Sequence, residues 1–298
     1  MKALITGGAG FIGQALTKKL LSTGWEVAVF DNWTTGKNRY LLDPRVEAIW
    51  GDVRERRHFE KIRFVTHFFH LAAPSSIILF NQNQFDCVET TILGFINAID
   101  YCSRRNIRLV YPSTGSLYAG AQKPHSETTK LDLSKINSYA KTKYALETIQ
   151  QAYKNQCNML GLRIFAGYGP EEAHKGEYAS VVYDFVKKMK NGERPVLYGK
   201  GHQTRDFIYS EDLADIIINL TLKANEDIIN IGSGQAISFN LLIIAINIML
   251  NTKIKPKYID KPADYLEETL CDTTLMRKYY TEPLTSLEEG IKRTLRSL

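Results

Sequence analysis

The stretch of sequence that decides the fold reads Ile5-Thr6-Gly7-Gly8-Ala9-Gly10-Phe11-Ile12-Gly13. It joins a short apolar run, Lys2 to Thr6, to a segment with helical periodicity, Phe11 to Leu21. Its glycines at spacing i, i+3 and i+6 allow a tight turn, a close approach to a pyrophosphate and packing of the helix on the strand. The start of the helix then offers N–H groups to the phosphates. The stretch therefore predicts a βα turn that binds a dinucleotide.

An acidic residue closes the next predicted strand, Glu26 to Phe30, about 20 residues after the glycine turn. A carboxylate at this place, Asp31, hydrogen-bonds the ribose hydroxyls of NAD and repels the extra phosphate of NADP. Glycine-rich turns alone are common in proteins, but the order of strand, glycines, helix, strand and acid is specific. The sequence therefore predicts NAD as the cofactor.

The rest of the N-terminal half alternates strands with helices. The predicted strands are Val46 to Trp50, Thr66 to Leu71, Arg108 to Tyr111 and Met159 to Phe165, and the predicted helices are Phe85 to Arg105 and Asn137 to Asn155. This alternation predicts an α/β fold with a Rossmann-like doubly wound parallel sheet, covered by helices on both faces.

The pattern loosens after Tyr168. Predicted helices lie at Tyr178 to Asn191, Glu211 to Leu222 and Ser238 to Leu250, with short strands near Val196, Phe207 and Ile229. We expect an NAD-binding domain over residues 1–167 and a smaller C-terminal substrate-binding lobe over 168–298, with the elements near 205–235 as candidates to return to the first domain.

Composition excludes several classes of protein. The longest apolar run, Phe239 to Leu250, is shorter than the roughly 20 residues of a membrane span, and no signal peptide precedes the first strand. The formal charge of +6 comes without an aromatic-interleaved basic stripe, so we expect no nucleic-acid partner. Four cysteines without CxxC spacing favour reduced thiols in or near the core, and they are Cys87, Cys102, Cys157 and Cys271. We expect a cytoplasmic protein without a membrane segment.

The histidines do not form a metal site. His67 and His70 are three residues apart on a predicted strand, so their side chains point to opposite faces and cannot share a metal. We interpret His70 as a packed residue at the strand end. His125, His174 and His202 are predicted on loops, without another ligand at metal-binding spacing. A Gly-x-Ser-x-Gly elbow of a serine hydrolase is absent from the sequence as well.

A tyrosine and a lysine stand four residues apart in Tyr139-Ala140-Lys141-Thr142-Lys143, on one face of a predicted helix. An ammonium nearby favours the phenolate, so we expect the pKa of Tyr139 to fall from about 10 towards neutral. Such a pair can take the proton from a sugar hydroxyl while a hydride leaves the same carbon. The motif recurs at Tyr183 and Lys187 without a preceding strand-end hydroxyl, and we interpret that second pair as surface residues.

Hydroxyl side chains follow the predicted strand that precedes this helix, in Pro112-Ser113-Thr114-Gly115-Ser116-Leu117-Tyr118. The carboxyl ends of strands in doubly wound sheets face the ligand crevice, so Ser113 and Thr114 can reach the carbon that the tyrosine addresses. In the alternative interpretation, this is a turn whose hydroxyls bond their own backbone. Position alone leaves both open.

Together these motifs resemble the extended short-chain dehydrogenase/reductase family, in its NAD-dependent nucleotide-sugar epimerase/dehydratase branch, and are similar to the UDP-glucose/UDP-galactose 4-epimerases. The resemblance runs from Lys2 to about Leu287. It is supported by Asp31-Asn32-Trp33-Thr34-Thr35-Gly36, Gly51-Asp52-Val53-Arg54, His70-Leu71-Ala72-Ala73, Leu162-Arg163-Ile164-Phe165, Tyr168-Gly169-Pro170 and Arg205-Asp206-Phe207-Ile208-Tyr209 with Asp212.

The resemblance implies roles for individual residues. Tyr139 is implied as the catalytic base, Lys143 as the residue that binds the nicotinamide ribose and polarises Tyr139, and Thr114 as the catalytic hydroxyl. The residues implied to bind NAD are Gly7, Gly10, Phe11, Ile12, Gly13, Asp31, Asn32, Asp52, Val53, Leu71, Ala72, Ala73, Tyr139 and Lys143. The residues implied to lie at the substrate are Ser113, Thr114, Gly115, Ser116, Ala166, Arg205 and Lys261. A homodimer through the two long helices, 85–105 and 137–155, is implied as well.

Departures from the family pattern narrow the predicted reaction. The 4,6-dehydratases and decarboxylases of this branch carry an acid between the hydroxyl and the tyrosine, where this chain has Gly115 and Ser116. Ala166 replaces a usual Asn, Thr91 a common Asn, and Lys261 stands near a usual Arg. The segment 171–180 resembles the ADP-heptose 6-epimerases, whereas Asp31-Asn32 resembles the UDP-galactose 4-epimerases.

The sequence thus predicts an NAD-dependent nucleotide-sugar epimerase acting at C4 through a 4-keto intermediate, with a nucleotide-diphosphate sugar as substrate. The alternatives are a nucleotide-4-keto-sugar reductase, a 4,6-dehydratase and a non-catalytic NAD-sensing regulator with the same fold. Tyr139 and Lys143 argue against the regulator, because a sensor can do without them.

Overall fold

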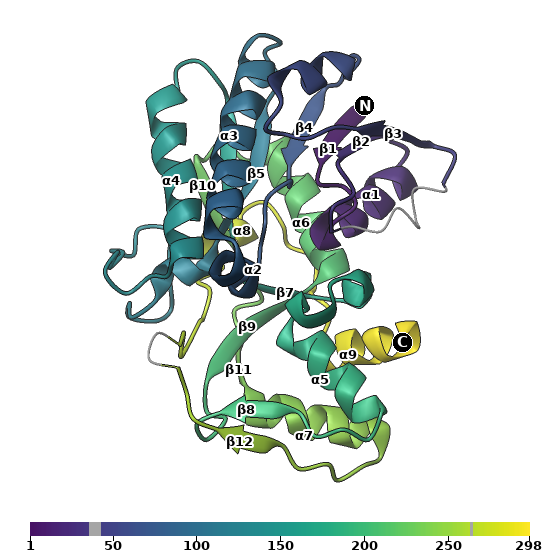
Figure 1. Ribbon diagram of the computed structural model, residues 1–298, viewed down its shortest axis with the longest axis vertical. Helices are drawn as coiled ribbons and strands as arrows, with labels where there is room; N and C mark the ends of the chain where they lie inside the picture. Colours follow the sequence, from purple (N-terminus) through teal and green to yellow (C-terminus); the bar gives the residue numbers. More distant parts are fainter. Residues whose placement is uncertain (36–42, 263–264) are drawn as a thin grey trace. The chain divides into compact units, whose positions relative to one another are not determined.

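The computed structural model describes residues 1–35, 43–262 and 265–298 (Figure 1). By its contacts the chain divides into two compact units, and each unit draws on three segments. Unit 1 comprises Met1–Thr114, Ser138–Arg163 and Ala214–Ile229. Unit 2 comprises Gly115–Asn137, Ile164–Leu213 and Asn230–Leu298. The chain therefore enters each unit more than once.

A parallel sheet forms the centre of unit 1, and its described strands follow the order β10-β6-β5-β4-β1-β2-β3. The strands are β1 (Lys2–Thr6), β2 (Glu26–Asp31), β3 (Val46–Trp50), β4 (His67–His70), β5 (Leu109–Thr114), β6 (Met159–Ile164) and β10 (Ile228–Ile231). β1 pairs in parallel with β2 and β4, so Leu4 lies opposite Ala28 on one side and Phe68 on the other. The order reverses between β1 and β4, and doubly wound sheets bind ligands beyond the carboxyl ends of the strands at such a point. The predicted Rossmann-like fold is confirmed.

Helices cover both faces of this sheet, and Figure 1 shows α3 and α4 on one side of it with α1 on the other. The helices of unit 1 are α1 (Phe11–Ser22), α2 (Ile77–Gln82), α3 (Gln84–Ser103), α4 (Ser138–Tyr153) and most of α6 (Ser210–Lys223). On α3, Phe95, Ala98 and Cys102 recur at helical spacing and are fully buried in the core that contains Phe68. Burial of one large apolar side chain contributes about 1.5–3 kcal/mol, so this stripe holds α3 to the sheet.

Unit 2 has a separate core. Its elements are β7 (Ala166–Tyr168), β8 (Val196–Tyr198), β9 (Thr204–Tyr209), β11 (Ala236–Ser238), β12 (Lys257–Ile259), α5 (Val181–Lys190), α7 (Phe239–Leu250), α8 (Thr274–Arg277) and α9 (Leu287–Ser297). The strands form the small sheets β11-β9-β7 and β12-β8. Tyr168 packs edge-on against Phe207 at 6.2 Å in this core, with Val186 and Phe239 buried in the same cluster.

The helix α2 was not predicted from the sequence. Its segment, Ile77 to Phe80, reads as an apolar run too short to show a helical period. In the structure Asn83 both ends α2 and caps α3, because its side chain accepts a hydrogen bond from the backbone of Asp86. One capping residue therefore separates two helices that share no obvious break in the sequence.

The structure confirms the predicted burial of the cysteines and contradicts the predicted exposure of Tyr183. All four cysteines are free and buried, as the sequence predicts. The placement of Tyr183 at the surface is wrong: its side chain is buried on the apolar face of α5, and only Lys187 is exposed. Among the described helices, none has both the length and the apolar character that crossing a bilayer requires.

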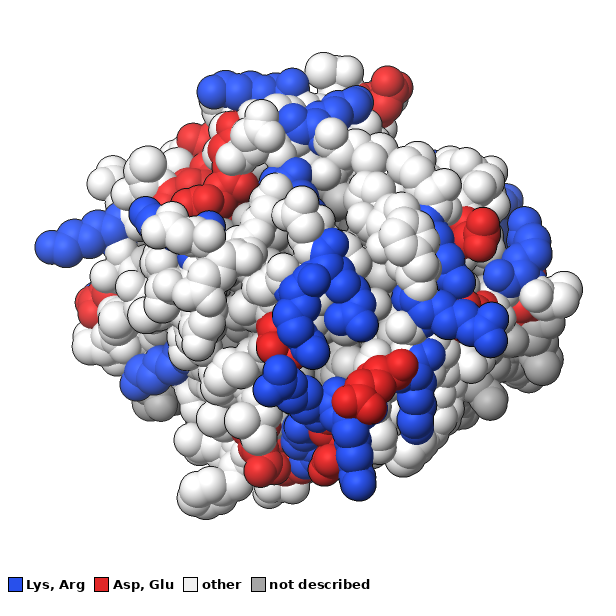
Figure 2. Space-filling view, turned by 90° about the horizontal axis from the view of Figure 1, so that it is seen from above, with Lys and Arg blue, Asp and Glu red and all other residues white. Residues whose placement is uncertain are grey.

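Charged side chains of both signs are interspersed on the face drawn in Figure 2, where Lys and Arg gather in the middle of the view with Asp and Glu among them. In unit 1, the exposed guanidinium of Arg56 pairs with Asp100 at 2.8 Å. Exposed pairs of this kind contribute at most about 1 kcal/mol each. The charge pattern therefore affects solubility and association more than the fold.

Candidate active site

The glycine turn between β1 and α1 closes against the loop that follows β4. Gly7 has φ +68°, and a Cβ built on it would lie 2.6 Å from the backbone nitrogen of Ala72. Gly10 differs, because a Cβ there would meet, within 4 Å and among described atoms, only the Gly7 carbonyl at 3.2 Å. No described side chain caps α1 at Gly10. The start of α1 is therefore a glycine-lined cradle open to a phosphate group.

The carboxylate of Asp31 ties the end of β2 to this turn. Its Oδ2 accepts a hydrogen bond from the Ala9 backbone N–H at 2.9 Å, and its Oδ1 accepts one from the Trp33 N–H at 2.8 Å. Burial raises the pKa of Asp31, and the backbone N–H groups oppose that rise. The Asn32 N–H is a third backbone donor to this carboxylate. A carboxylate has about four lone-pair sites, so Asp31 can still accept a hydrogen bond from a ribose hydroxyl.

The other residues predicted to bind NAD lie in the loops around these two features. Asp52 bonds the guanidinium of Arg54 at 3.0 and 2.7 Å, and this contact lowers the pKa of Asp52. Asn32 is a further side-chain partner of Asp52. Val53 is buried in the core, and Leu71, Ala72 and Ala73 are half-buried just after β4. The remaining predicted residues, Phe11, Ile12 and Gly13, form the first turn of α1.

Three predicted catalytic residues lie within unit 1. Thr114 ends β5 and is hydrogen-bonded to Tyr139 in the first turn of α4, whose ring packs edge-on against Phe80 at 5.5 Å. Lys143 follows one turn later and is only 2% exposed. Its ammonium makes no hydrogen bond or ion pair with any residue that the structure describes. A buried ammonium without a partner is costly, so this side chain fits a polar ligand such as a ribose.

The pKa of Tyr139 departs from the sequence-based expectation. In the free chain burial raises this pKa above its usual value, and the hydrogen bond with Thr114 opposes the rise. Lys143 does not lower it, because the ammonium itself is buried and its pKa falls to about 8. The expected fall of the Tyr139 pKa towards neutral is therefore wrong, because the loss of water on burial outweighs the hydrogen bond with Thr114.

The strand end of β5 holds the other residues predicted beside Thr114. Ser113 is buried and donates a hydrogen bond to Glu147 of α4 at 2.5 Å. Gly115 and Ser116 begin the 3-10 turn η3 (Gly115–Tyr118). The Ser113 hydroxyl therefore bonds the Glu147 side chain and not the backbone of its own turn.

Two of the residues in unit 2 that are predicted to lie at the substrate, Arg205 and Lys261, make hydrogen bonds or ion pairs within the protein. The Arg205 guanidinium donates to the carbonyl oxygens of Thr204 and Leu266 at 2.9 and 2.7 Å. Lys261 is exposed and pairs with Glu267. Ala166 begins β7 and is half-buried.

A family model described as the NAD dependent epimerase/dehydratase family matches residues 3–232 of this sequence. The chain belongs to this family. It is therefore an NAD-dependent enzyme of the epimerase/dehydratase type, an extended short-chain dehydrogenase/reductase, and the cradle at Gly10 and the acid at Asp31 fit that cofactor.

Relatives in this family catalyse more than one reaction. The “Putative UDP-glucose 4-epimerase” of Methanocaldococcus jannaschii is 30% identical over 298 residues, which cover 98% of this chain and 96% of that protein. UDP-glucuronic acid decarboxylase 1 of Xenopus tropicalis is 30% identical, with 99% and 71% covered. The structure of the UDP-glucose 4-epimerase of Thermotoga maritima with UDP-glucose matches at a TM-score of 0.91 and 27% identity, with 100% and 98% covered. Family membership therefore does not choose between epimerisation and decarboxylation.

Sequence reasoning missed two side chains near the predicted site: Phe80, which contacts Tyr139, and Glu147, which accepts a hydrogen bond from Ser113. The Phe80 ring packs against Tyr139. The sequence does not single out Phe80, because its segment is too short to show a helical period. Glu147 stands eight residues after Tyr139, at the helical spacing that already linked Tyr139 to Lys143. Extending that spacing by one more turn would have singled out Glu147.

The predicted packing of His70 is confirmed. It is buried at the end of β4, and its Nδ1 lies 2.9 Å from the Thr6 hydroxyl. Burial, with a smaller contribution from Lys143, lowers the pKa of His70 to about 3, so this imidazole is neutral. Within the described ranges, no three His, Cys, Asp or Glu side chains form a group able to hold a metal ion.

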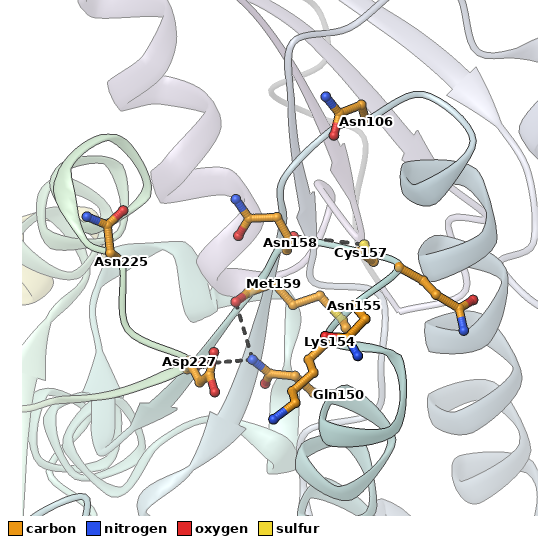
Figure 3. A pocket seen from close by; sticks show the side chains of 10 residues that line it. Asn106, Gln150, Lys154, Asn155, Cys157, Asn158, Met159, Asn225 and Asp227 are labelled. Atoms are coloured by element: carbon orange, nitrogen blue, oxygen red, sulfur yellow. Dashed lines mark hydrogen bonds between the residues drawn. The ribbon is translucent and has the colours of Figure 1, made fainter.

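A polar pocket of about 270 Å³ is lined by residues at the N-terminal ends of β5, β6 and β10, among them Asn106, Met159 and Asp227 (Figure 3). Gln150 and Lys154 from the end of α4 line it, together with Asp227 before β10, and Gln150 donates to the Asp227 carbonyl at 3.0 Å. At 1.5 Å per residue, Gln150 is about 16 Å along α4 from Tyr139. This pocket is therefore separate from the candidate active site.

Proposed function

We propose that the protein is a nucleotide-sugar 4-epimerase that works through a 4-keto intermediate. The observation that carries this proposal is the arrangement at the start of α4. Thr114 bonds Tyr139 there, and one turn away the buried ammonium of Lys143 has no hydrogen-bond or ion-pair partner among the described residues. An acid–base hydroxyl pair beside an unpaired cation is suited to moving a proton on and off a sugar hydroxyl.

In the proposed mechanism Tyr139 accepts the proton of the sugar 4-hydroxyl, and Thr114 donates a hydrogen bond to the oxygen as it becomes a carbonyl. NAD, when bound, supplies the acceptor and donor of the hydride at the same carbon. After the 4-keto sugar has presented its other face, Tyr139 returns the proton to the oxygen. Lys143 is proposed to bind the ribose hydroxyls and, with its ammonium held there, to favour the Tyr139 phenolate.

Binding of NAD is assigned to the residues around the glycine turn and the adjacent strand ends, in the domain predicted over residues 1–167. These are Gly7, Gly10, Phe11, Ile12, Gly13, Asp31, Asn32, Asp52, Val53, Leu71, Ala72 and Ala73, with Tyr139 and Lys143. Asp31 would bond the ribose hydroxyls and exclude NADP.

We expect Gly10→Ala to weaken NAD binding about ten- to a hundredfold, which corresponds to about 1.4–2.7 kcal/mol. The added methyl group meets the protein itself only at the Gly7 carbonyl and otherwise fills the cradle. Calorimetric titration with NAD checks the affinity, and thermal unfolding of the NAD-free protein checks the fold. Gly7→Ala is the contrast, because its methyl group would press on the Ala72 backbone and should lower the unfolding temperature. Unchanged NAD affinity in Gly10→Ala would contradict the assigned cradle.

The nucleotide sugar is assigned to the lobe predicted over residues 168–298 and to the β5 strand end. Arg205 donates to the carbonyl oxygens of Thr204, Leu266 and Glu267, and Tyr265 is a further side-chain partner. A guanidinium has five N–H groups, so one N–H remains for a diphosphate. The remaining substrate residues are proposed to be Ser113, Thr114, Gly115, Ser116, Ala166 and Lys261.

Epimerisation is favoured over the other reactions of the family by the residues after Thr114. A dehydratase or decarboxylase of this branch is expected to carry an acid there, and this chain has Gly115 and Ser116. A keto-sugar reductase would consume reduced cofactor stoichiometrically, and a sensor would not turn over sugars at all.

Incubation with UDP-glucose, UDP-N-acetylglucosamine and UDP-glucuronic acid, without added cofactor, separates these activities. We expect a 4-epimer from one of the first two and an unchanged UDP-glucuronic acid. Release of CO₂ or water, or turnover only with added reduced cofactor, would contradict the proposal.

We further propose a homodimer through α3 and α4. On α3, Leu93 and Ile96 are 42% and 39% exposed at a spacing of three residues, which leaves an apolar stripe for a second copy. Light scattering should give twice the mass of one chain, and a single-chain mass would contradict this pairing.

A further inference from the structure

Three buried side chains join the strand end beside Thr114 to the helix that carries Tyr139. Glu147 lies on α4 four residues after Lys143 and eight after Tyr139, so the three share one face of the helix. Glu147 is 7% exposed, Arg163 of β6 is 6% exposed and Ser113 of β5 is 3% exposed. The cluster adjoins the candidate active site, because Ser113 directly precedes Thr114 and Glu147 follows Lys143 by one helical turn.

The contacts within the cluster are close and mutually consistent. Arg163 binds Glu147 through two parallel hydrogen bonds, Nε to Oε1 at 2.9 Å and Nη2 to Oε2 at 2.7 Å. Ser113 Oγ donates to the same Oε1 at 2.5 Å. A bidentate pair fixes the plane of the carboxylate, and the hydroxyl then fixes the backbone of β5 one residue before Thr114.

We propose that Glu147 is a positioning residue which, held in place by Arg163, uses Ser113 to set the end of β5 so that Thr114 meets Tyr139. This inference rests on the proposed function of Tyr139 and Thr114. It also gives Ser113 a role that differs from a direct contact with the substrate.

Stability alone is a poor explanation of this cluster. Buried ion pairs are often no more stabilising than apolar side chains of similar size, because both charges must lose their water. A second buried link between the same elements already exists, since Tyr111 of β5 donates to Gln150 of α4 at 2.5 Å. Tyr111 and Ser113 are two residues apart and face the same side of the strand. The Ser113 link is the one adjacent to Thr114.

Tyr111 supplies a matched control, because Tyr111→Phe and Ser113→Ala each remove one buried hydroxyl between β5 and α4. We expect Ser113→Ala to lower kcat about ten- to a hundredfold with KM changed by less than about twofold, as for a small misplacement of a catalytic group. Both variants should lower the unfolding temperature by similar amounts, because each loses one buried hydrogen bond. Tyr111→Phe, however, should leave kcat within about twofold of the unchanged protein.

A second measurement does not depend on turnover. The ionisation of Tyr139 can be followed by NMR of protein labelled at the tyrosine Cζ, with its signal assigned by its loss in Tyr139→Phe. The Thr114 hydrogen bond lowers the Tyr139 pKa, so Ser113→Ala should move the titration midpoint to higher pH and Tyr111→Phe should not. Near the cluster, Lys143 lies one turn before Glu147 on α4, and Tyr111 of β5 interacts electrostatically with Glu147, Arg163 and Asp227. Near Tyr139, Lys143 in turn interacts with the buried His70.

Each outcome decides between roles. A raised KM with unchanged kcat in Ser113→Ala would assign Ser113 to the substrate and overturn the proposal. Equal effects of Ser113→Ala and Tyr111→Phe on the Tyr139 midpoint would make the cluster merely structural. If the unchanged protein epimerises no sugar, the proposed function fails, while the Tyr139 midpoints of the two variants still test the positioning. Glu147→Gln keeps an acceptor for Ser113 and should retain more of kcat than Glu147→Ala.

Discussion

Replacing Tyr139 by phenylalanine is expected to lower kcat about a thousandfold, which lies within the usual contribution of a positioned acid or base. The change removes only the phenolic oxygen, so the ring can keep its edge-on contact with Phe80. NAD binding should weaken less than in Gly10→Ala, because the glycine turn and Asp31 are untouched and only the proposed contact of the Tyr139 phenolic oxygen is lost. Steady-state kinetics and calorimetric titration with NAD check the two halves of this prediction.

The second Tyr-Lys motif provides the control for this variant. Tyr183→Phe removes a phenolic oxygen from the buried face of α5 in unit 2 and should leave kcat unchanged within about twofold. Near-normal turnover by Tyr139→Phe, or an equal loss in Tyr183→Phe, would show that Tyr139 is not the base.

Replacing Lys143 by methionine should lower kcat at least about a hundredfold and yet stabilise the NAD-free chain. The ammonium is buried and has no hydrogen-bond or ion-pair partner in the part of the chain that the structure describes, and its pKa is about 8 instead of the usual 10.5. This difference corresponds to about 3 kcal/mol that burial of the charge costs the folded state. Methionine has a similar length and carries no charge, so it removes the cost without leaving a cavity. NAD affinity should fall, because the ribose loses its partner.

The cost of burying the Lys143 charge should make the stability of the unchanged protein depend on pH. Below pH 8 the lysine is charged in both the folded and the unfolded chain, and the full cost is present. Between about pH 8 and 10.5 the unfolded chain binds the proton more tightly, so the stability of the unchanged protein rises with pH towards that of Lys143→Met. Denaturant unfolding of NAD-free protein across this window checks the slope, with Lys187→Met at the exposed position on α5 as the control. A stability difference between the unchanged protein and Lys143→Met that is constant with pH would contradict the buried charge.

Local patterns accounted for much of the fold and the site. The spacing of Gly7, Gly10 and Gly13 between an apolar strand and a helix needs no long-range information, and β1, α1 and Asp31 lie where it predicts. The four-residue spacing of Tyr139 and Lys143 likewise places them on one face of α4.

Features that depend on tertiary contacts were not accessible in this way. The direction of the Tyr139 pKa follows from burial, which the spacing of Tyr139 and Lys143 does not reveal. The Ser113–Glu147–Arg163 cluster joins β5, α4 and β6, and nothing in any one segment marks it. Tyr183 was placed at the surface because its motif lacked a strand-end hydroxyl, although its neighbours on α5 are apolar.

The central claim is that hydrogen leaves C4 of a nucleotide sugar and returns to the same carbon on the other face, while Tyr139 carries the proton. The most direct measurement uses UDP-glucose and UDP-N-acetylglucosamine deuterated at C4, incubated with the NAD-holding protein in ordinary water without added cofactor. We predict that one of them is converted into its 4-epimer with the deuterium still on C4. A 4-epimer that has lost its deuterium to water, or turnover of neither sugar, would contradict the account.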